Sequence, residues 1–193
     1  MEKAEIMSRV LDLLLENKKE ESLEYAKKHY PFVSNTKGFR KCSPYNATIV
    51  FLRDGFIDRY SGQKLIFPGI FQIVRKNLPE AFPAHSHWKM QETHIYYYEL
   101  FPSIDHIIPV ARGGEDNEGN WITTSMIKNS SKANWTLQEL NWEIYPAGNL
   151  CDWDGLVDTF LKIIGANKSL LEDKYILKWY NALIRAMKHL EIS

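Results

Sequence analysis

Apolar residues recur every three to four positions at the start of the chain. Ile6, Val10, Leu13 and Leu14 have this spacing, with charged residues between them, which is the pattern of an amphipathic helix. The pattern predicts helix over residues 3–29. Acidic and basic side chains nearly balance in this segment, so we interpret its polar face as solvated rather than as a partner site.

Two further helices are predicted from the residues at their ends. One begins near Asn46 and runs to Leu52, and Gly55 shortly beyond it is a typical residue to stop a helix. Another begins at Thr136, because Thr136 and Glu139 have the spacing of a capping box.

Residues 152–191 predict two more helices, of which the first is capped by Asp152 or Asp154. Their apolar positions follow the helical repeat: Leu156, Phe160, Ile163 and Ile164 in the first, and Leu170, Leu171, Tyr175, Ile176, Trp179, Leu183, Met187 and Leu190 in the second. Such stripes more often pack into a core than form a site, and a homodimer surface is the alternative.

The middle of the chain, residues 55–145, is instead rich in Pro, Gly and aromatic residues. Residues 104–110 have the character of a short buried strand that Pro109 interrupts. Gly113-Gly114 marks a tight turn, and residues 127–133 are compatible with a helix.

Composition narrows the class of protein. The 193 residues include 24 Lys and Arg against 24 Asp and Glu, so the formal net charge is zero. A neutral chain argues against a nucleic-acid binder that works by bulk positive charge, although a local basic groove is compatible with it. The length and the hydrophobic fraction of 45% are those of one soluble globular domain with small appendages.

Cysteine content and the lack of apolar runs bear on location. Cys42 and Cys151 are too few for a disulfide framework or a four-cysteine zinc site, so we expect a reducing compartment in which both thiols act as small apolar residues. No apolar stretch approaches the ~20 residues that span a bilayer, and the N-terminus lacks the pattern of a secretory signal. The expectation is a cytoplasmic protein with no membrane partner.

The segment from Asp105 to Lys132 carries the candidate chemistry. Its informative parts are Asp105-His106-Ile107-Ile108-Pro109, Arg112-Gly113-Gly114, Asn120-Trp121 and Asn129-Ser130-Ser131-Lys132. Each part alone is common in proteins. The spacings are specific when taken together, with 14 residues from His106 to Asn120, 9 from there to Asn129 and 3 from there to Lys132.

This order and spacing resembles the HNH endonuclease motif, also called the ββα-metal nuclease motif, in a His-Asn-Asn variant. The flanking sequence, from residues 51–62 through Trp135-Thr136-Leu137 to Trp153-Asp154-Gly155, looks like a bacterial group of HNH-domain proteins. The resemblance implies an α+β fold with a small ββα-metal core and helical N- and C-terminal extensions. The implied organisation is an N-terminal helical extension at 1–45, a nuclease core at 46–145 with a long insertion at about 65–103, and a C-terminal helical segment at 146–193.

The resemblance also implies a role for each motif residue. His106 is the general base, since a neutral imidazole, with an ordinary pKa of about 6.5, can take a proton from water at physiological pH. Asp105 and Asn129 are metal ligands, and a carboxylate with an amide oxygen suits one Mg²⁺ or Mn²⁺ ion per site. Asn120 braces the loop and orients the general base.

Four basic residues are candidates for contact with nucleic acid. Lys132 lies one helical turn beyond Asn129, where it either touches the reacting phosphate or is a solvated helix lysine. Arg112 either contacts phosphate or forms a structural ion pair, and the ion pair is favoured. Lys128 and Arg59 lie near the motif in the sequence and complete the set.

The sequence departs from many HNH domains at the positions of a zinc knuckle. The two Cys-x-x-Cys pairs of such a knuckle would fall at Asp58 and Ser61 and at Ser125 and Lys128, and none of these is cysteine. No structural zinc is therefore expected, and ordinary packing, helped by an aromatic content of 13%, must replace it.

The long insertion is a second departure, and it contains His85-Ser86-His87. Histidines two positions apart share a face only on an extended chain, and no third ligand is evident nearby. A loop packed by aromatic residues is favoured over contact with nucleic acid and over a second metal site.

The function that the resemblance implies is a metal-dependent endonuclease that hydrolyses DNA phosphodiester bonds, in restriction or phage defence. The alternatives are a catalytically silent nucleic-acid-binding module on the same scaffold and a nuclease directed at RNA. One motif per chain cuts one strand at a time. A double-strand break would then need a homodimer, two sequential nicks or a second enzyme.

Overall fold

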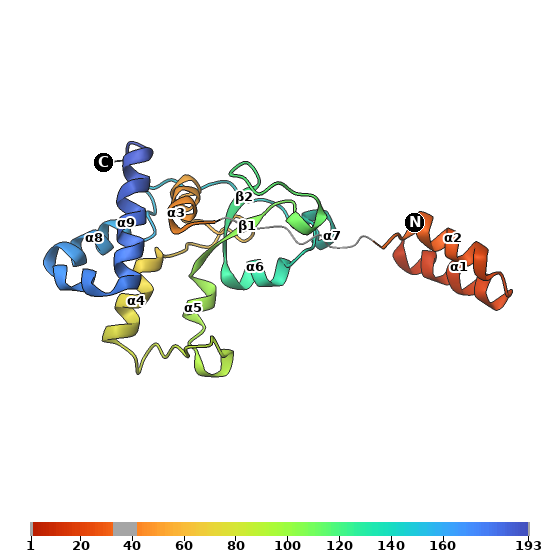
Figure 1. Cartoon of the computed structure of the whole chain (residues 1–193), viewed down its shortest axis with the longest axis horizontal. Coiled ribbons are helices and arrows are strands. Elements are labelled where there is room, and N and C mark those ends of the chain that lie inside the picture. The colour runs from red at the N-terminus through yellow and green to blue at the C-terminus, as the bar shows by residue number, and fades with distance from the viewer. Residues whose placement is uncertain (1, 33–41, 193) are drawn as a thin grey trace. The chain divides into compact units, whose positions relative to one another are not determined.

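The computed structural model of the chain describes residues 2–32 and 42–192 (Figure 1). The chain divides into two compact units, Met1–Thr36 and Lys37–Ser193. Each unit has its own packing.

The first unit is a hairpin of two helices, α1 (Lys3–Leu15) and α2 (Lys19–His29). The prediction of continuous helix over residues 3–29 is wrong at Asn17, which adopts a left-handed conformation with φ of 60°. Asparagine tolerates this conformation better than most residues, so the chain can reverse there. Ile6 and Leu13 are buried, and Ser22 of α2 donates a hydrogen bond to the carbonyl of Val10 across 2.9 Å.

In its described part, residues 42–192, the second unit contains helices and one two-stranded antiparallel sheet. Its elements in chain order are α3 (Pro44–Arg53), α4 (Pro68–Asn77), the 3₁₀ turn η1 (Met90–Glu92), α5 (Tyr96–Glu99), β1 (Pro102–His106), η2 (Val110–Arg112), β2 (Trp121–Ser125), α6 (Met126–Lys132), α7 (Leu137–Leu140), α8 (Val157–Ala166), η3 (Lys168–Glu172) and α9 (Lys174–His189). The structure is therefore mixed helical and β, compatible with the predicted α+β class.

The core of this unit lies where α9 packs on α3 and α4 (Figure 1). The ring of Phe67 lies 5.0 Å from that of Phe160 and 6.0 Å from that of Trp179, measured between centroids. Phe160, Ile176 and Leu183 are completely buried. The apolar stripes of the C-terminal segment thus form core, which is the interpretation that the sequence favoured.

The capping prediction is confirmed for α7 and wrong for α8. Leu156, not Asp152 or Asp154, precedes α8, and its side chain makes no cap, although Asp154 accepts a hydrogen bond from the backbone N–H of Asp158 in the first turn. Thr136 and Glu139 form the predicted capping box at the start of α7. Ser43 caps α3, three residues before the predicted start, and Pro44 occupies its first turn. Leu170 and Leu171 lie in η3 rather than in α9, because Asp173 caps α9 by accepting hydrogen bonds from its first backbone N–H groups.

The predicted strand over residues 104–110 is displaced toward the N-terminus, since β1 begins at Pro102 and ends at His106. The backbone N–H and carbonyl of Ile108 bond to the side chain of Asn120 instead of to a neighbouring strand. Pro109 has no N–H to offer a ladder, so the sheet cannot continue through it.

Two buried carboxylates join the loop after α3 to β2. Asp54 accepts a hydrogen bond from the backbone N–H of Thr123 at 2.8 Å, and Asp58 accepts one from that of Ser125 at 2.9 Å. Both aspartates are completely buried.

The cysteines and the lengths of the helices complete the description. Cys42 and Cys151 are free and exposed. The expectation that both thiols pack as small apolar residues is therefore wrong. Within residues 2–32 and 42–192, no helix has both the length and the apolar character needed to cross a lipid bilayer.

Candidate active site

β1, β2 and α6 follow one another in the chain and bring four of the predicted site residues together. His106 ends β1 and pairs in register with Trp121, the first residue of β2. α6 starts directly after β2, where the hydroxyl of Ser125 accepts a hydrogen bond from the backbone N–H of Lys128. α6 packs on both strands, which places Asn129 and Lys132 beside the Asp105-His106 pair.

Asp105 has one engaged oxygen and one open oxygen. Its Oδ2 accepts a hydrogen bond from the Tyr60 hydroxyl at 2.8 Å and lies 2.8 Å from the ammonium of Lys132. Burial, together with the charge of Asp105, raises the pKa of Tyr60 above its ordinary value, so Tyr60 remains a neutral donor. The other carboxylate oxygen of Asp105, Oδ1, has no hydrogen-bond partner among the residues that the structure describes.

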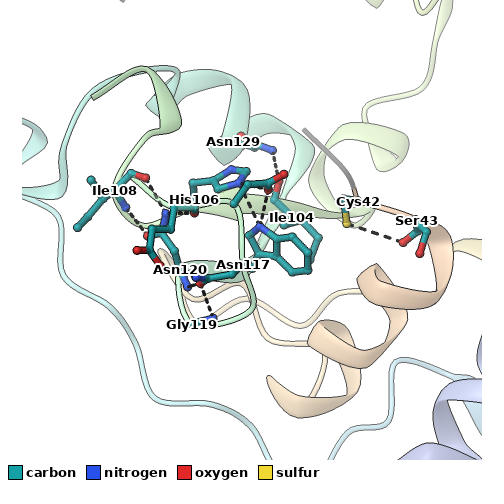
Figure 2. Close-up of polar contacts among 12 residues, drawn as sticks. Cys42, Ser43, Ile104, His106, Ile108, Asn117, Gly119, Asn120 and Asn129 are labelled. Carbon is teal, nitrogen blue, oxygen red and sulfur yellow. Dashed lines mark hydrogen bonds and ion pairs between the residues drawn. The ribbon is translucent and has the colours of Figure 1, made fainter. Parts of the chain in front are cut away.

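The side-chain amide of Asn129, like the carboxylate of Asp105, has one engaged atom and one open oxygen. Its Nδ2 donates to the hydroxyl of Ser103 at 2.6 Å. It also donates to the carbonyl of Ile104 at 3.0 Å, as Figure 2 shows. Both donor hydrogens are used on β1, and Oδ1 accepts no hydrogen bond from the described part of the chain. Asp105 and Asn129 also line one pocket of about 310 Å³, together with Ser103, Met126, Ser130, Ala133 and Asn134.

These donors suit a sparse metal site. A carboxylate and an amide oxygen that share a pocket are hard ligands, which Mg²⁺ and Mn²⁺ accept while keeping several waters. No cluster of three or more His, Cys, Asp or Glu able to hold a metal occurs within the described ranges, so these two oxygens would be the protein's share. The Lys132 ammonium offsets the charge of Asp105, and we expect weak affinity for a cation there.

Lys132 is completely buried. Besides its ion pair with Asp105, its Nζ donates to the carbonyl of His106 at 2.8 Å. A buried ammonium is tolerated when it is paired and hydrogen-bonded in this way. The predicted contact of Lys132 with a phosphate would require the ammonium to leave both partners.

His106 is 6% exposed, and its ring meets two polar side chains. Nε2 lies 2.8 Å from Oδ1 of Asp116, and Nε1 of Trp121 lies 3.1 Å from the same His106 nitrogen and 2.9 Å from the same Asp116 oxygen. Asp116 was missed by sequence reasoning, because it lies in a loop with no periodic pattern. The available signal was an acidic residue between the Gly-Gly turn and Asn120.

Asn120 spans the loop that follows His106 (Figure 2). Its side chain accepts from the N–H of Ile108 at 2.9 Å and donates to the carbonyls of Ile108 and Glu115, each at 2.8 Å. Gly114 lies against this bridge, and a Cβ atom there would come within 1.9 Å of the Ile108 carbonyl oxygen. Asn120 therefore holds both ends of the loop.

Like Lys132, two more of the basic residues predicted to bind nucleic acid are engaged within the protein. The guanidinium of Arg59 lies 2.9 Å from Asp54 and is 18% exposed. Arg112 reaches Glu139, with 3.7 Å between Nη2 and Oε1. This ion pair matches the favoured interpretation of Arg112.

Lys128 has a different environment at the edge of the site. Its ammonium lies 4.8 Å from the centroid of the Trp142 ring, which in turn lies 5.5 Å from the ring of Tyr60. A half-buried lysine beside an aromatic ring keeps donors for a phosphate and offers a ring face for a base. Because Tyr60 also bonds to Asp105, this edge adjoins the pocket.

The imidazole of His85, in the insertion, is occupied by local contacts. Nδ1 of His85 accepts from the backbone N–H of His87 at 3.1 Å, and Nε2 lies 3.7 Å from Glu92. Nearby, the ring of Phe71 lies 4.7 Å from that of Tyr96. The segment is packed by aromatic rings, as the sequence favoured.

Comparisons of the chain with protein-family models, with curated proteins and with solved structures found no match. The resemblance to HNH endonucleases consequently depends on the motif residues of the sequence.

Proposed function

We propose that the chain is a metal-dependent HNH-type endonuclease that hydrolyses DNA phosphodiester bonds. The observation that carries the proposal is the shared pocket of Asp105 and Asn129, each with an open oxygen. His106 follows Asp105 directly at the end of β1 but does not line this pocket. In a buried polar cluster with a purely structural role, we would expect most such oxygens to be hydrogen-bonded within the protein.

In this proposal, His106 takes a proton from a water molecule through its imidazole. The water oxygen forms a bond to phosphorus as the bond from phosphorus to the 3′ oxygen breaks, and the leaving oxygen receives a proton from solvent. Mg²⁺ or Mn²⁺ held by Asp105 and Asn129 would supply positive charge against the phosphate. Lys128 and Trp142 would contact the strand beside the pocket.

A catalytically silent nucleic-acid-binding module is the second candidate. It is favoured by the 2.8 Å ion pair that ties Lys132 to Asp105 and by the burial of His106. A working site must admit water to a base that is 6% exposed in the free chain.

The experiment that tests the proposal uses the full chain on supercoiled plasmid, linear duplex and structured RNA. Each substrate is incubated with Mg²⁺, with Mn²⁺ and with EDTA. We expect plasmid nicking that requires the metal, falls by ~10²-fold or more in His106→Ala, and is retained in His87→Ala, a matched change at an exposed histidine. Cleavage that survives His106→Ala would refute the assignment of the base.

The same assay separates the alternatives. Duplex binding without cleavage under every metal condition would establish the silent module. Faster cleavage of structured RNA than of duplex would assign the site to RNA.

A further inference from the structure

We infer that Asp116 and Trp121 together set the tautomer of His106, so that Nε2 carries the proton and Nδ1 remains the nitrogen able to accept one. Both would be positioning residues, since they act through His106. The effect on cleavage depends on the proposed function. The effect on the tautomer does not.

The inference follows from the donors and acceptors at the contact. A carboxylate only accepts and an indole N–H only donates, whereas a neutral imidazole has one nitrogen of each kind. Asp116 Oδ1 lies 2.8 Å from His106 Nε2 and 2.9 Å from Trp121 Nε1. With a proton on Nε2, this oxygen accepts two hydrogen bonds. With the proton on Nδ1, the lone pair of Nε2 would face the carboxylate at 2.8 Å without a hydrogen between them.

Trp121 Nε1 also lies 3.1 Å from His106 Nε2. This contact allows a second hydrogen-bond pattern, in which the indole N–H donates to the imidazole instead of to Asp116. If Asp116 is removed, Nε2 becomes the nearest acceptor for the indole N–H. Trp121 is 5% exposed, and leaving a buried donor unpaired is costly. The imidazole proton then moves to Nδ1, which can no longer accept a proton from water.

Asn120 is linked to the same hydrogen-bond network. Its Nδ2 donates to the carbonyl of Glu115, the residue directly before Asp116. The bridge across the loop therefore positions the Asp116 carboxylate, and this supplies a physical route by which Asn120 orients the imidazole.

The test measures the tautomer directly. Full chain labelled with ¹⁵N in its histidine rings is studied by long-range ¹H–¹⁵N correlation, at a pH where the ring shifts no longer change. Spectra of His106→Gln identify the His106 signals among the six histidines. We expect Nε2–H in wild type and in Trp121→Phe, Nδ1–H in Asp116→Ala, and loss of the Nδ1–H form in the double variant Asp116→Ala/Trp121→Phe.

Cleavage under single-turnover conditions gives the functional half of the test. We expect Asp116→Ala to lower the rate by ~10²-fold, the scale of a lost general base, and the double variant to recover at least part of that loss. Recovery on removal of a second side chain is an outcome that simple structural damage does not produce.

The two inferences fail separately. An Nδ1–H tautomer in wild type, or Nε2–H retained in Asp116→Ala, overturns the tautomer inference whatever the activity. Once His106→Gln has identified the signals, the wild-type spectrum decides this even if the Asp116 and Trp121 variants do not fold. The expected tautomers in a chain that cleaves nothing would support this inference and refute the proposed function.

Discussion

The carboxylate of Asp58 accepts a hydrogen bond from the backbone N–H of Ser125 across 2.9 Å. These residues stand where the first cysteines of the two knuckle pairs would fall by resemblance to zinc-containing HNH domains. A buried carboxylate thus joins the two segments that correspond, by this resemblance, to those joined by the zinc ion in zinc-containing HNH domains. Its other oxygen accepts from the backbone N–H of Tyr60 at 2.9 Å and from the Thr124 hydroxyl at 3.0 Å.

Asp58→Ala should therefore destabilise the unit strongly. The substitution leaves three donors without their acceptor in a buried place, and each such loss costs about 1–3 kcal/mol. We expect a decrease of about 3 kcal/mol in the free energy of unfolding, measured by urea denaturation. Asp152→Ala, at an exposed aspartate, is the control and should change stability little. Equal stability of the two variants would contradict a joining role for Asp58.

Features that depend on neighbouring residues could be predicted from the sequence. Features that depend on contacts between residues far apart in the chain could not. The capping residues of α7 act within one helical turn, so their spacing was sufficient. The break at Asn17 depends on a left-handed backbone conformation. The spacing of apolar residues carries no information about such a conformation, so the break could not be predicted from it. The motif predicted that Asn129 lies near Asp105, and the two line one pocket. Tyr60 bonds to Asp105 across 45 positions of the chain, and no local sequence pattern reveals such a contact.

Gly114→Ala should disrupt the loop that follows His106. The added Cβ would lie 1.9 Å from the Ile108 carbonyl oxygen and 2.9 Å from Asn120 Nδ2, so the backbone or the bridge must move. We expect loss of hydrogen-exchange protection at the Ile108 amide, which donates to Asn120. Gly165→Ala, where a Cβ meets nothing within 4 Å, is the matched control. Unchanged protection at Ile108 in Gly114→Ala would show that the loop tolerates the side chain.

Asp173 should make stability depend on acid pH. Burial acts to raise its pKa, but hydrogen bonds from Gln72, Lys76 and the first N–H groups of α9 outweigh burial and hold the pKa well below its ordinary value. A carboxyl with a lowered pKa in the folded state contributes stability above its unfolded pKa of about 3.9, and loses it as the pH falls toward the folded value.

The variant Asp173→Asn tests this dependence. At pH 7 we expect it to be less stable than wild type by about 2 kcal/mol, and the difference should shrink steadily below pH 4. Urea denaturation between pH 7 and pH 2 measures it. Asp158→Asn, at a carboxylate that is 67% exposed, should show no comparable trend. A constant deficit for Asp173→Asn across this range would mean that packing, not charge, explains the loss.

Lys132→Met separates the structural role of the buried ammonium from its effect on the proposed metal site. Methionine keeps an unbranched chain, but the change leaves Asp105 without its ionic partner at 2.8 Å. Breaking a buried ion pair costs about 3–5 kcal/mol, so the melting temperature without metal should fall. Binding of a divalent cation should strengthen in the variant, because the charge of Asp105 is no longer offset. Mn²⁺ should therefore raise the melting temperature of Lys132→Met more than that of wild type, and Asn129→Ala in the same background should reduce the gain. If Mn²⁺ instead affects wild type and Lys132→Met equally, Asp105 is not a metal ligand.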